Sequence, residues 1–153
     1  MLYLATLTIN LAWHGWLCMK NKRDHHKNAA WHNLVMQFVL VATSANCFLR
    51  GVELAQPMMM GIALVGFATV GTNLWFIYRQ PTSAKTRIKE HIKSLVGAGI
   101  SVYTAFFAFG AVRFVPEIAL TPGLWAIPLV TGLVLIVYHQ RAVMSPSRKV
   151  QPT

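Results

Sequence analysis

The chain contains few charged residues. Asp, Glu, Lys and Arg make up 12% of its 153 residues, whereas a soluble domain usually contains about 25%. Acidic residues are the rarest, with 4 Asp and Glu against 14 Lys and Arg, so the formal net charge is +10. A nucleic-acid-binding domain would need soluble basic faces, but 55% of the residues are hydrophobic and the mean hydropathy is +0.47. This composition argues against nucleic-acid partners and predicts an integral membrane protein.

Cysteines and sequence signatures of catalysis are also scarce. Two cysteines, Cys18 and Cys47, are too few for a disulfide-rich secreted scaffold. The sequence has no Walker loop, no GxSxG motif, no HExxH motif and no closely spaced Cys/His set for zinc. These absences leave an enzymatic activity uncertain and favour a protein without a catalytic site.

Five apolar stretches are long enough, or nearly so, to cross the roughly 30 Å hydrocarbon core of a bilayer as helices. None alternates with period two over its length, which disfavours a transmembrane barrel. We expect an all-α integral membrane bundle of five transmembrane helices forming a single domain over residues 1–144, with four spans as the fallback count. A polar tail follows at 145–153. The predicted spans cover residues 2–19, 31–49, 57–78, 91–114 and 123–139.

The basic residues divide unevenly between the linkers. Twelve of the 14 Lys and Arg lie in or beside the first and third linkers and in the C-terminal tail, while Arg50 and Arg113 belong to the other two linkers. Cytoplasmic loops of membrane proteins carry the excess of Lys and Arg. The distribution therefore predicts an outside N-terminus and a cytoplasmic C-terminus.

Polar side chains inside the predicted spans are costly without a partner and mark places of packing or function. Thr6, Asn10 and His14 recur every four residues and form one polar stripe on a helix face. Gln37 and Asn73 are expected at a depth similar to that of His14. Hydrogen bonding between helices, worth roughly 0.5 to 2 kcal/mol per contact, explains such a set. A ligand or cofactor pocket is the alternative.

All six histidines fall on the predicted cytoplasmic side or in the inner leaflet. A haem requires axial ligands that face each other across the bundle. By depth, the candidate haem ligands are His14 and His91, with His32 as a further candidate. His25 and His26 lie in the basic first linker, where we expect them to be solvated or close to lipid phosphates.

Small residues predict close helix packing along the fourth span. Their spacing places them on one face, where they let two helix backbones approach each other. The helix-packing set consists of Gly97, Ser101, Ala105 and Ala108.

The segment from Glu90 to Gly110, EHIKSLVGAGISVYTAFFAFG, resembles the C-terminal helices of small bacterial membrane proteins in a domain-of-unknown-function family, of the kind numbered 2306. A looser similarity covers RDHHKNAAWHNLVM. The resemblance implies a helical inner-membrane fold and draws attention to His26 and His91, but it implies no activity. The residues that carry the first match are His91, Gly97, Ala98, Ile100, Thr104, Ala105 and Phe106.

Three functions are consistent with these features. The first is a non-catalytic accessory subunit that packs against lipids and other membrane-protein subunits in a respiratory, photosynthetic or transport complex. The second is an electron carrier that binds haem or a quinone through the inner-leaflet histidines. The third is a small transporter built around the polar stripe, although no Asp or Glu lies within the predicted spans, which counts against proton coupling. The first is favoured because packing and topology account for every feature.

Overall fold

The computed structural model describes residues 2–79, 83–106, 110 and 122–144, and the side chains of the last helix from 127 to 142. Every regular element in this part of the chain is helical, which confirms the prediction of an all-α fold. The predicted tail at 145–153 lies outside the described residues. The elements are α1 (Leu2–Lys20), the short 3-10 helix η1 (His25–Ala29), α2 (Trp31–Glu53), α3 (Pro57–Tyr78), α4 (Ala84–Ala105) and α7 (Pro122–Met144).

Helix α4 differs most from its predicted span, because it begins at Ala84 and not at 91. The side chain of Ser83 accepts a hydrogen bond from the backbone N–H of Thr86, at 3.3 Å, and thereby caps the first turn. Of the described helices, α2 and α3 are the two whose length and apolar composition would allow them to cross a membrane. The five-span topology and the orientation of the termini therefore remain predictions.

The turn between α2 and α3 is tight. Ala55 adopts a left-handed conformation with φ of 50°, and its N–H bonds to the carbonyl of Val52, while the N–H of Gln56 bonds to that of Gly51. This pair of bonds closes a helix C-terminus in a Schellman motif, where glycine normally takes the left-handed position. Pro57 then starts α3 at a position where its missing N–H costs nothing.

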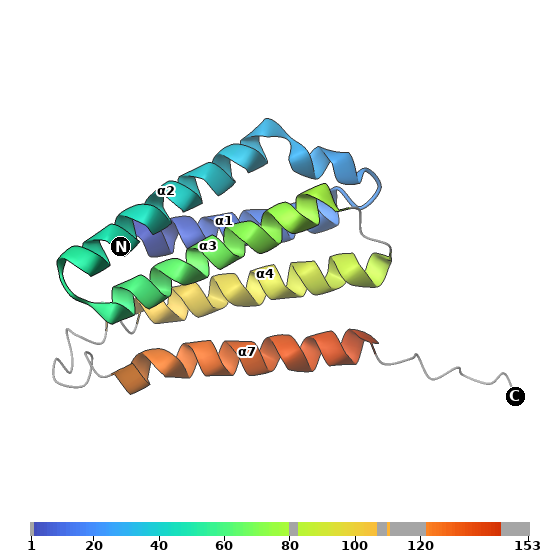
Figure 1. Ribbon diagram of the computed structural model, residues 1–153. Coiled ribbons are helices and arrows are strands. Elements are labelled where there is room, and N and C mark those ends of the chain that lie inside the picture. The colour runs from blue at the N-terminus through green and yellow to red at the C-terminus, as the bar shows by residue number, and fades with distance from the viewer. Residues whose placement is uncertain (1, 80–82, 107–109, 111–121, 145–153) are drawn as a thin grey trace, which may run out of the picture.

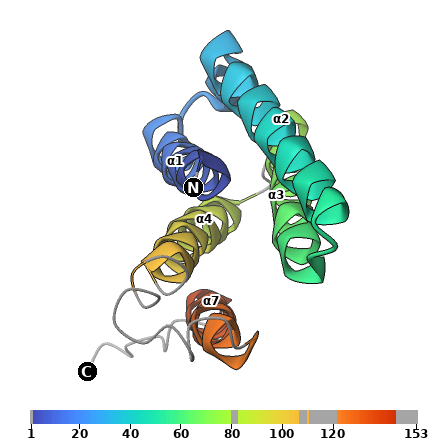
Figure 2. The ribbon, with the colours of Figure 1, turned by 90° about the vertical axis from the view of Figure 1, so that its left-hand side faces the viewer.

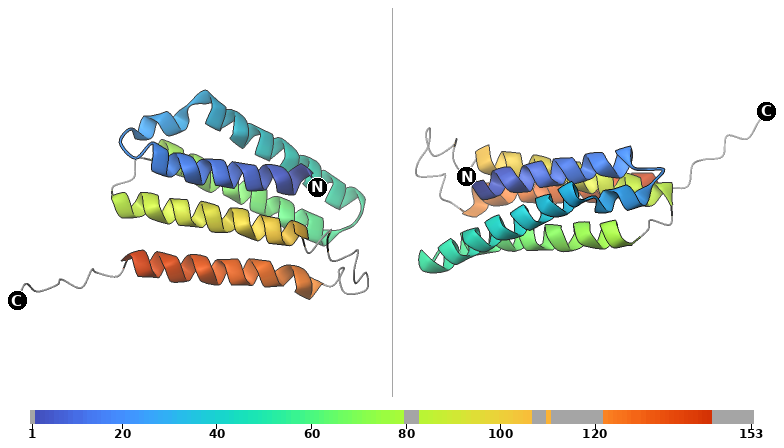
Figure 3. Two further views of the ribbon diagram at one scale, coloured as in Figure 1. Left: turned by 180° about the vertical axis from the view of Figure 1, so that it is seen from behind. Right: turned by 90° about the horizontal axis from the view of Figure 1, so that it is seen from above.

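The helices form two antiparallel pairs with one further helix at the side (Figures 1 and 2). Helix α1 packs along α4, and α2 packs along α3; α1 also contacts α2 and so joins the two pairs. Helix α7 lies against α4 on the far side from α2, as the left view of Figure 3 shows. The apolar core surrounds α1, whose Leu4, Leu7 and Leu11 pack with Leu40 of α2 and Val70 of α3.

The two ends of the bundle differ in charge. The N-terminus and the α2–α3 turn lie at one end, and η1, the start of α4 and the end of α7 lie at the other (Figure 1). Among the described residues, Arg50 is the one Lys or Arg at the first end. The predicted basic linkers thus meet at one end of the folded chain.

Glycine allows α3 to approach both α1 and α2. A Cβ added to Gly66 would lie 2.9 Å from Cε2 of Tyr3 and would overlap with Oγ of Ser44. The ring of Tyr3 cannot easily move away, because its hydroxyl donates a 2.6 Å hydrogen bond to the carbonyl of Ile62. Gly71, on the same helix, has no such neighbour within 4 Å.

We therefore expect Gly66→Ala and Gly71→Ala to change stability in opposite directions. Alanine favours a helix over glycine by about 1 kcal/mol, so Gly71→Ala is expected to raise the free energy of unfolding by up to about that amount. Gly66→Ala adds an overpacking penalty of about 1 to 3 kcal/mol and is expected to lower it. Thermal unfolding of the two purified variants in detergent measures the difference, and equal shifts would contradict the close approach at Gly66.

Candidate functional site

Three amides from three helices meet in the centre of the bundle. Asn10 of α1, Gln37 of α2 and Asn73 of α3 are each at most 3% exposed. The Nδ2 group of Asn73 donates to Oδ1 of Asn10 at 3.0 Å and to Oε1 of Gln37 at 3.4 Å. Nδ2 of Asn10 donates in turn to the backbone carbonyl of Met36. The structure thus brings Gln37 and Asn73, which the sequence places at similar depth, together with Asn10 of the predicted polar stripe.

The other members of the stripe, Thr6 and His14, lie on α1 one turn to either side of this amide cluster. Toward the N-terminus, Oγ1 of Thr6 lies 2.9 Å from Oγ1 of Thr43 on α2. One turn toward the basic end, His14 is 1% exposed and packs edge-on against the ring of Phe76, with ring centroids 5.6 Å apart. The whole stripe therefore points into the bundle.

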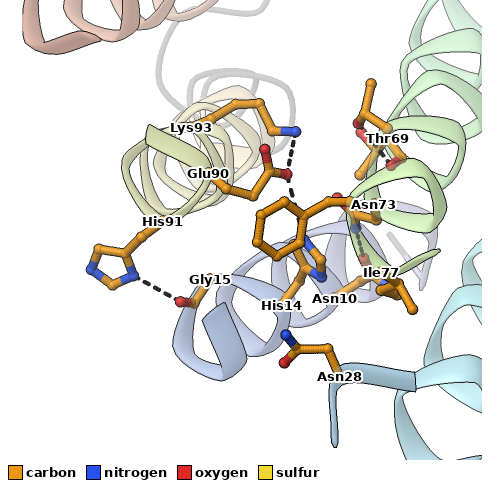
Figure 4. A network of polar contacts seen from close by, with 12 residues as sticks. Asn10, His14, Gly15, Asn28, Thr69, Asn73, Ile77, Glu90, His91 and Lys93 are labelled. Atoms are coloured by element: carbon orange, nitrogen blue, oxygen red, sulfur yellow. Dashed lines mark hydrogen bonds and ion pairs between the residues drawn. The ribbon is translucent and has the colours of Figure 1, made fainter. Parts of the chain in front are cut away.

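His14 contacts a carboxylate of α4. Its Nε2 atom lies 3.5 Å from Oε1 of Glu90, and the ammonium group of Lys93 contacts the same oxygen. Figure 4 shows the Glu90 side chain directed from α4 toward His14 on α1, with Lys93 beside it. These three residues, which we call the ionic cluster, join the two helices at the basic end of the bundle.

Glu90 is the functional candidate that the sequence reasoning missed. Asp24 and Glu53 are 46% and 62% exposed and pair with basic neighbours three residues away, whereas Glu90 is 14% exposed. The predicted span begins at 91 and therefore leaves Glu90 in the linker. The apolar spacing of Ile88 and Ile92 behind the capping residue Ser83 is the signal that would have extended the helix.

The surroundings of Glu90 favour its charged form. This residue precedes the predicted span at 91–114. Burial raises the pKa of the carboxyl group, but the contact with His14 and the ammonium group of Lys93 lower it by more, so the pKa of Glu90 lies below its ordinary value. The carboxylate is therefore held ionised at neutral pH.

The three candidate haem ligands have separate surroundings. His14 faces Glu90, as described above. His91 lies on another side of α4, where its Nδ1 donates to the carbonyl of Gly15 at 2.7 Å (Figure 4). His32 packs edge-on against Trp13 and Trp31. Within the described part of the chain, no three His, Cys, Asp or Glu residues form a group that could hold a metal ion.

His25 is buried, contrary to the expectation that it would be solvated. Its Nε2 donates to the carbonyls of Phe76 and Ile77 at 2.9 and 3.1 Å, and its Nδ1 accepts from Nδ2 of Asn28. Oδ1 of Asn28 accepts from Asn21. The last carbonyls of a helix have no partner within it, and His25 supplies one for α3. Its role is therefore to attach the first linker to the end of α3.

The helix-packing residues face α1. A Cβ on Gly97 would lie 3.3 Å from Leu11, Oγ of Ser101 lies 2.6 Å from Oγ1 of Thr8, and Ala105 packs against the apolar core. Ala108, the fourth member, lies outside the described residues. These contacts belong to the most extensive helix–helix interface in the described structure.

Comparison with protein-family models, curated proteins and solved structures finds no match to this chain. The resemblance of residues 90–110 to the domain-of-unknown-function family therefore remains a prediction. Any function has to be argued from the amide cluster, the ionic cluster and the surfaces of the helices.

Asn73→Leu is expected to lower the free energy of unfolding by about 1 to 3 kcal/mol, because it leaves the buried oxygens of Asn10 and Gln37 without their donor. Asn46→Leu, at an exposed position of α2, is the matched control and is expected to leave stability unchanged or higher. Thermal unfolding in detergent compares the two. Similar behaviour of both variants would show that the amide cluster does not stabilise the bundle.

Glu90→Gln is expected to destabilise the fold by about 1 kcal/mol at pH 7, because Lys93 and His14 lose a partly buried counter-charge. Since the folded-state pKa of Glu90 lies below the unfolded value of about 4.3, its stabilising contribution is present above that pH and is lost as the pH falls through the folded pKa. The difference in the free energy of unfolding between the native protein and Glu90→Gln should therefore decrease as the pH falls through the folded-state pKa of Glu90.

The control for this measurement is Glu53→Gln, which removes an exposed carboxylate paired with Arg50. It is expected to change the unfolding temperature little at any pH. A Glu90→Gln variant as stable as the native protein at pH 7 would show that the ionic cluster contributes nothing to folding.

Proposed function

We propose that the chain is a multi-pass inner-membrane protein that acts as a non-catalytic accessory subunit within a larger membrane complex. The membrane location is supported by large apolar side chains on the outer surface, such as Trp31 and Phe38 of α2, which are 76% and 73% exposed. Surfaces of this kind require cover by lipid or protein. The gathering of basic residues at one end supports an orientation with that end in the cytoplasm.

The observation that carries the accessory role is the exposure of α7. Among the described helices, α4 is the one against which α7 packs extensively, and between residues 127 and 142 the buried positions of α7 are Pro128 and Gly132. Membrane helices associate through close packing of their surfaces, so a second protein could pack along the opposite face of α7. The exposed large apolar side chains of α7 are Ile127, Leu129, Val130, Leu133, Val134, Leu135, Val137 and Tyr138, of which Leu129 and Leu133 face the space between α7 and α3 and the others do not.

Photo-crosslinking tests this contact. A photoreactive phenylalanine analogue at Val134, on the face of α7 away from Pro128 and Gly132, is expected to give one discrete protein adduct in intact membranes. The same partner should co-migrate with the native chain on a native gel in mild detergent. The analogue at Phe38 of α2 is the control for contact with lipid and should give no discrete protein adduct. A chain that migrates alone and forms no adduct from Val134 would contradict the proposal.

A further inference from the structure

A large apolar cavity lies between α1, α3, α4 and α7. Its volume is about 580 Å³, which falls within the range of small-molecule sites, roughly 300 to 1,000 Å³. Its walls include Leu7 and Leu11 of α1, Val65 of α3 and Leu133 of α7. In the described structure, α3 and α4 are not among the helix pairs that pack extensively. Seen along the helix axes, α3 and α7 lie apart from each other, and α4 lies to one side of both (Figure 2). The cavity is the space that these helices leave between them.

The cavity is long. Along α3 it extends from Met58 to Thr72, which corresponds to about 21 Å at 1.5 Å per helical residue. One leaflet of a bilayer supplies about 15 Å of hydrocarbon, half of the roughly 30 Å core. An occupant that fills the cavity therefore has an apolar chain longer than one leaflet is thick.

The polar end of the cavity carries paired charges. Lys93 lines this end together with Thr69 and Thr72, and its ammonium group contacts Glu90 of the ionic cluster (Figure 4). Because the charges of Lys93 and Glu90 cancel, an anionic phosphate head group would have to compete with Glu90 for the ammonium group. A neutral head group with carbonyl oxygens can accept a hydrogen bond from a second N–H of Lys93 without displacing Glu90.

We propose that this cavity binds an isoprenoid quinone, with its tail along the apolar walls and a ring carbonyl accepting a hydrogen bond from Lys93. A long apolar chain and an uncharged polar head are the two properties of a quinone that match the length of the cavity and the paired charges at its end. The proposal rests on the membrane location proposed above but not on the accessory role, since binding requires no partner at α7.

Quinone that co-purifies with the full-length chain is the first measurement. The protein is purified in detergent from bacterial membranes that contain ubiquinone, and the quinone is extracted with organic solvent and quantified per chain. Ala68→Phe places a ring in the cavity from an exposed position of α3, and Ala42→Phe makes the same change at an exposed position of α2 outside the cavity. Ala68→Phe is expected to lower the bound quinone at least about tenfold, equivalent to 1.4 kcal/mol, with Ala42→Phe unchanged.

The second measurement addresses the head group. Lys93→Met keeps the apolar stem but removes the donor, and is expected to weaken binding of a short-chain ubiquinone about five- to tenfold, the loss of one hydrogen bond. Lys85→Met, at an exposed position of the same helix, is expected to bind like the native chain. Both comparisons use only variants that elute from a size-exclusion column at the same volume as the native protein. If Ala68→Phe fails to fold, Lys93→Met still tests the site.

Three results would overturn the proposal. Equal quinone in Ala68→Phe and native protein would show that the cavity is not the site. Equal loss in Ala68→Phe and Ala42→Phe would show a general effect of the added ring on the protein, unrelated to the cavity. If Ala68→Phe loses bound phospholipid and not quinone, the occupant of the cavity is an acyl chain. None of these results affects the crosslink at Val134, so failure of the quinone site and failure of the accessory role can be told apart.

Discussion

The polar face of α1 has to find hydrogen-bonding partners inside an apolar bundle, and this requirement determines which helices surround it. A buried amide or imidazole without a partner costs several kcal/mol in an apolar environment. Asn10 is paired by Asn73 of α3 and by the backbone of α2, whereas Nε2 of His14 contacts the carboxylate of Glu90 on α4 at 3.5 Å without a regular hydrogen bond. Because these partners lie on different sides, α1 is held between the α2–α3 pair and α4.

Close packing at small residues, in addition to the hydrogen bonds, holds the neighbouring helices against α1. Ser44 and Tyr3 can occupy their positions because Gly66 has no side chain, and α1 approaches α4 where Gly15 faces Ser94 and Gly97 faces Leu11. Within a membrane, contacts of this kind replace the hydrophobic effect as the force between helices. The polar contacts therefore select the neighbours of α1, and the small residues set how closely those neighbours approach.

The sequence allowed most of the helices to be predicted, because length, hydropathy and basic linkers are local properties. It also predicted that Gln37 and Asn73 lie at a depth similar to that of His14, since depth follows from position along a predicted span, but it did not place Asn10 at that depth with them. It could not reveal which atoms meet. His25 lies in a linker by every local criterion, and its burial depends on the carbonyls of Phe76 and Ile77, about fifty residues away. Glu90 was missed for a local reason, because hydropathy does not detect the polar first turns of α4.

The position of Glu90 also explains why the cavity exists. Its side chain reaches across to His14 on α1 and not to α3, so the partner that secures α4 lies on the α1 side. Among the described residues, α3 and α4 are not a pair that packs extensively, and Gly97, Ile100, Ala68 and Val65 line the space between them. A bundle held together by the polar face of α1 thus leaves an apolar opening between the helices that α1 separates. Among the described residues that line that opening, Lys93 is the one charged side chain, and it is already neutralised by Glu90. The interaction that organises the fold therefore also determines the polarity and the charge of its cavity.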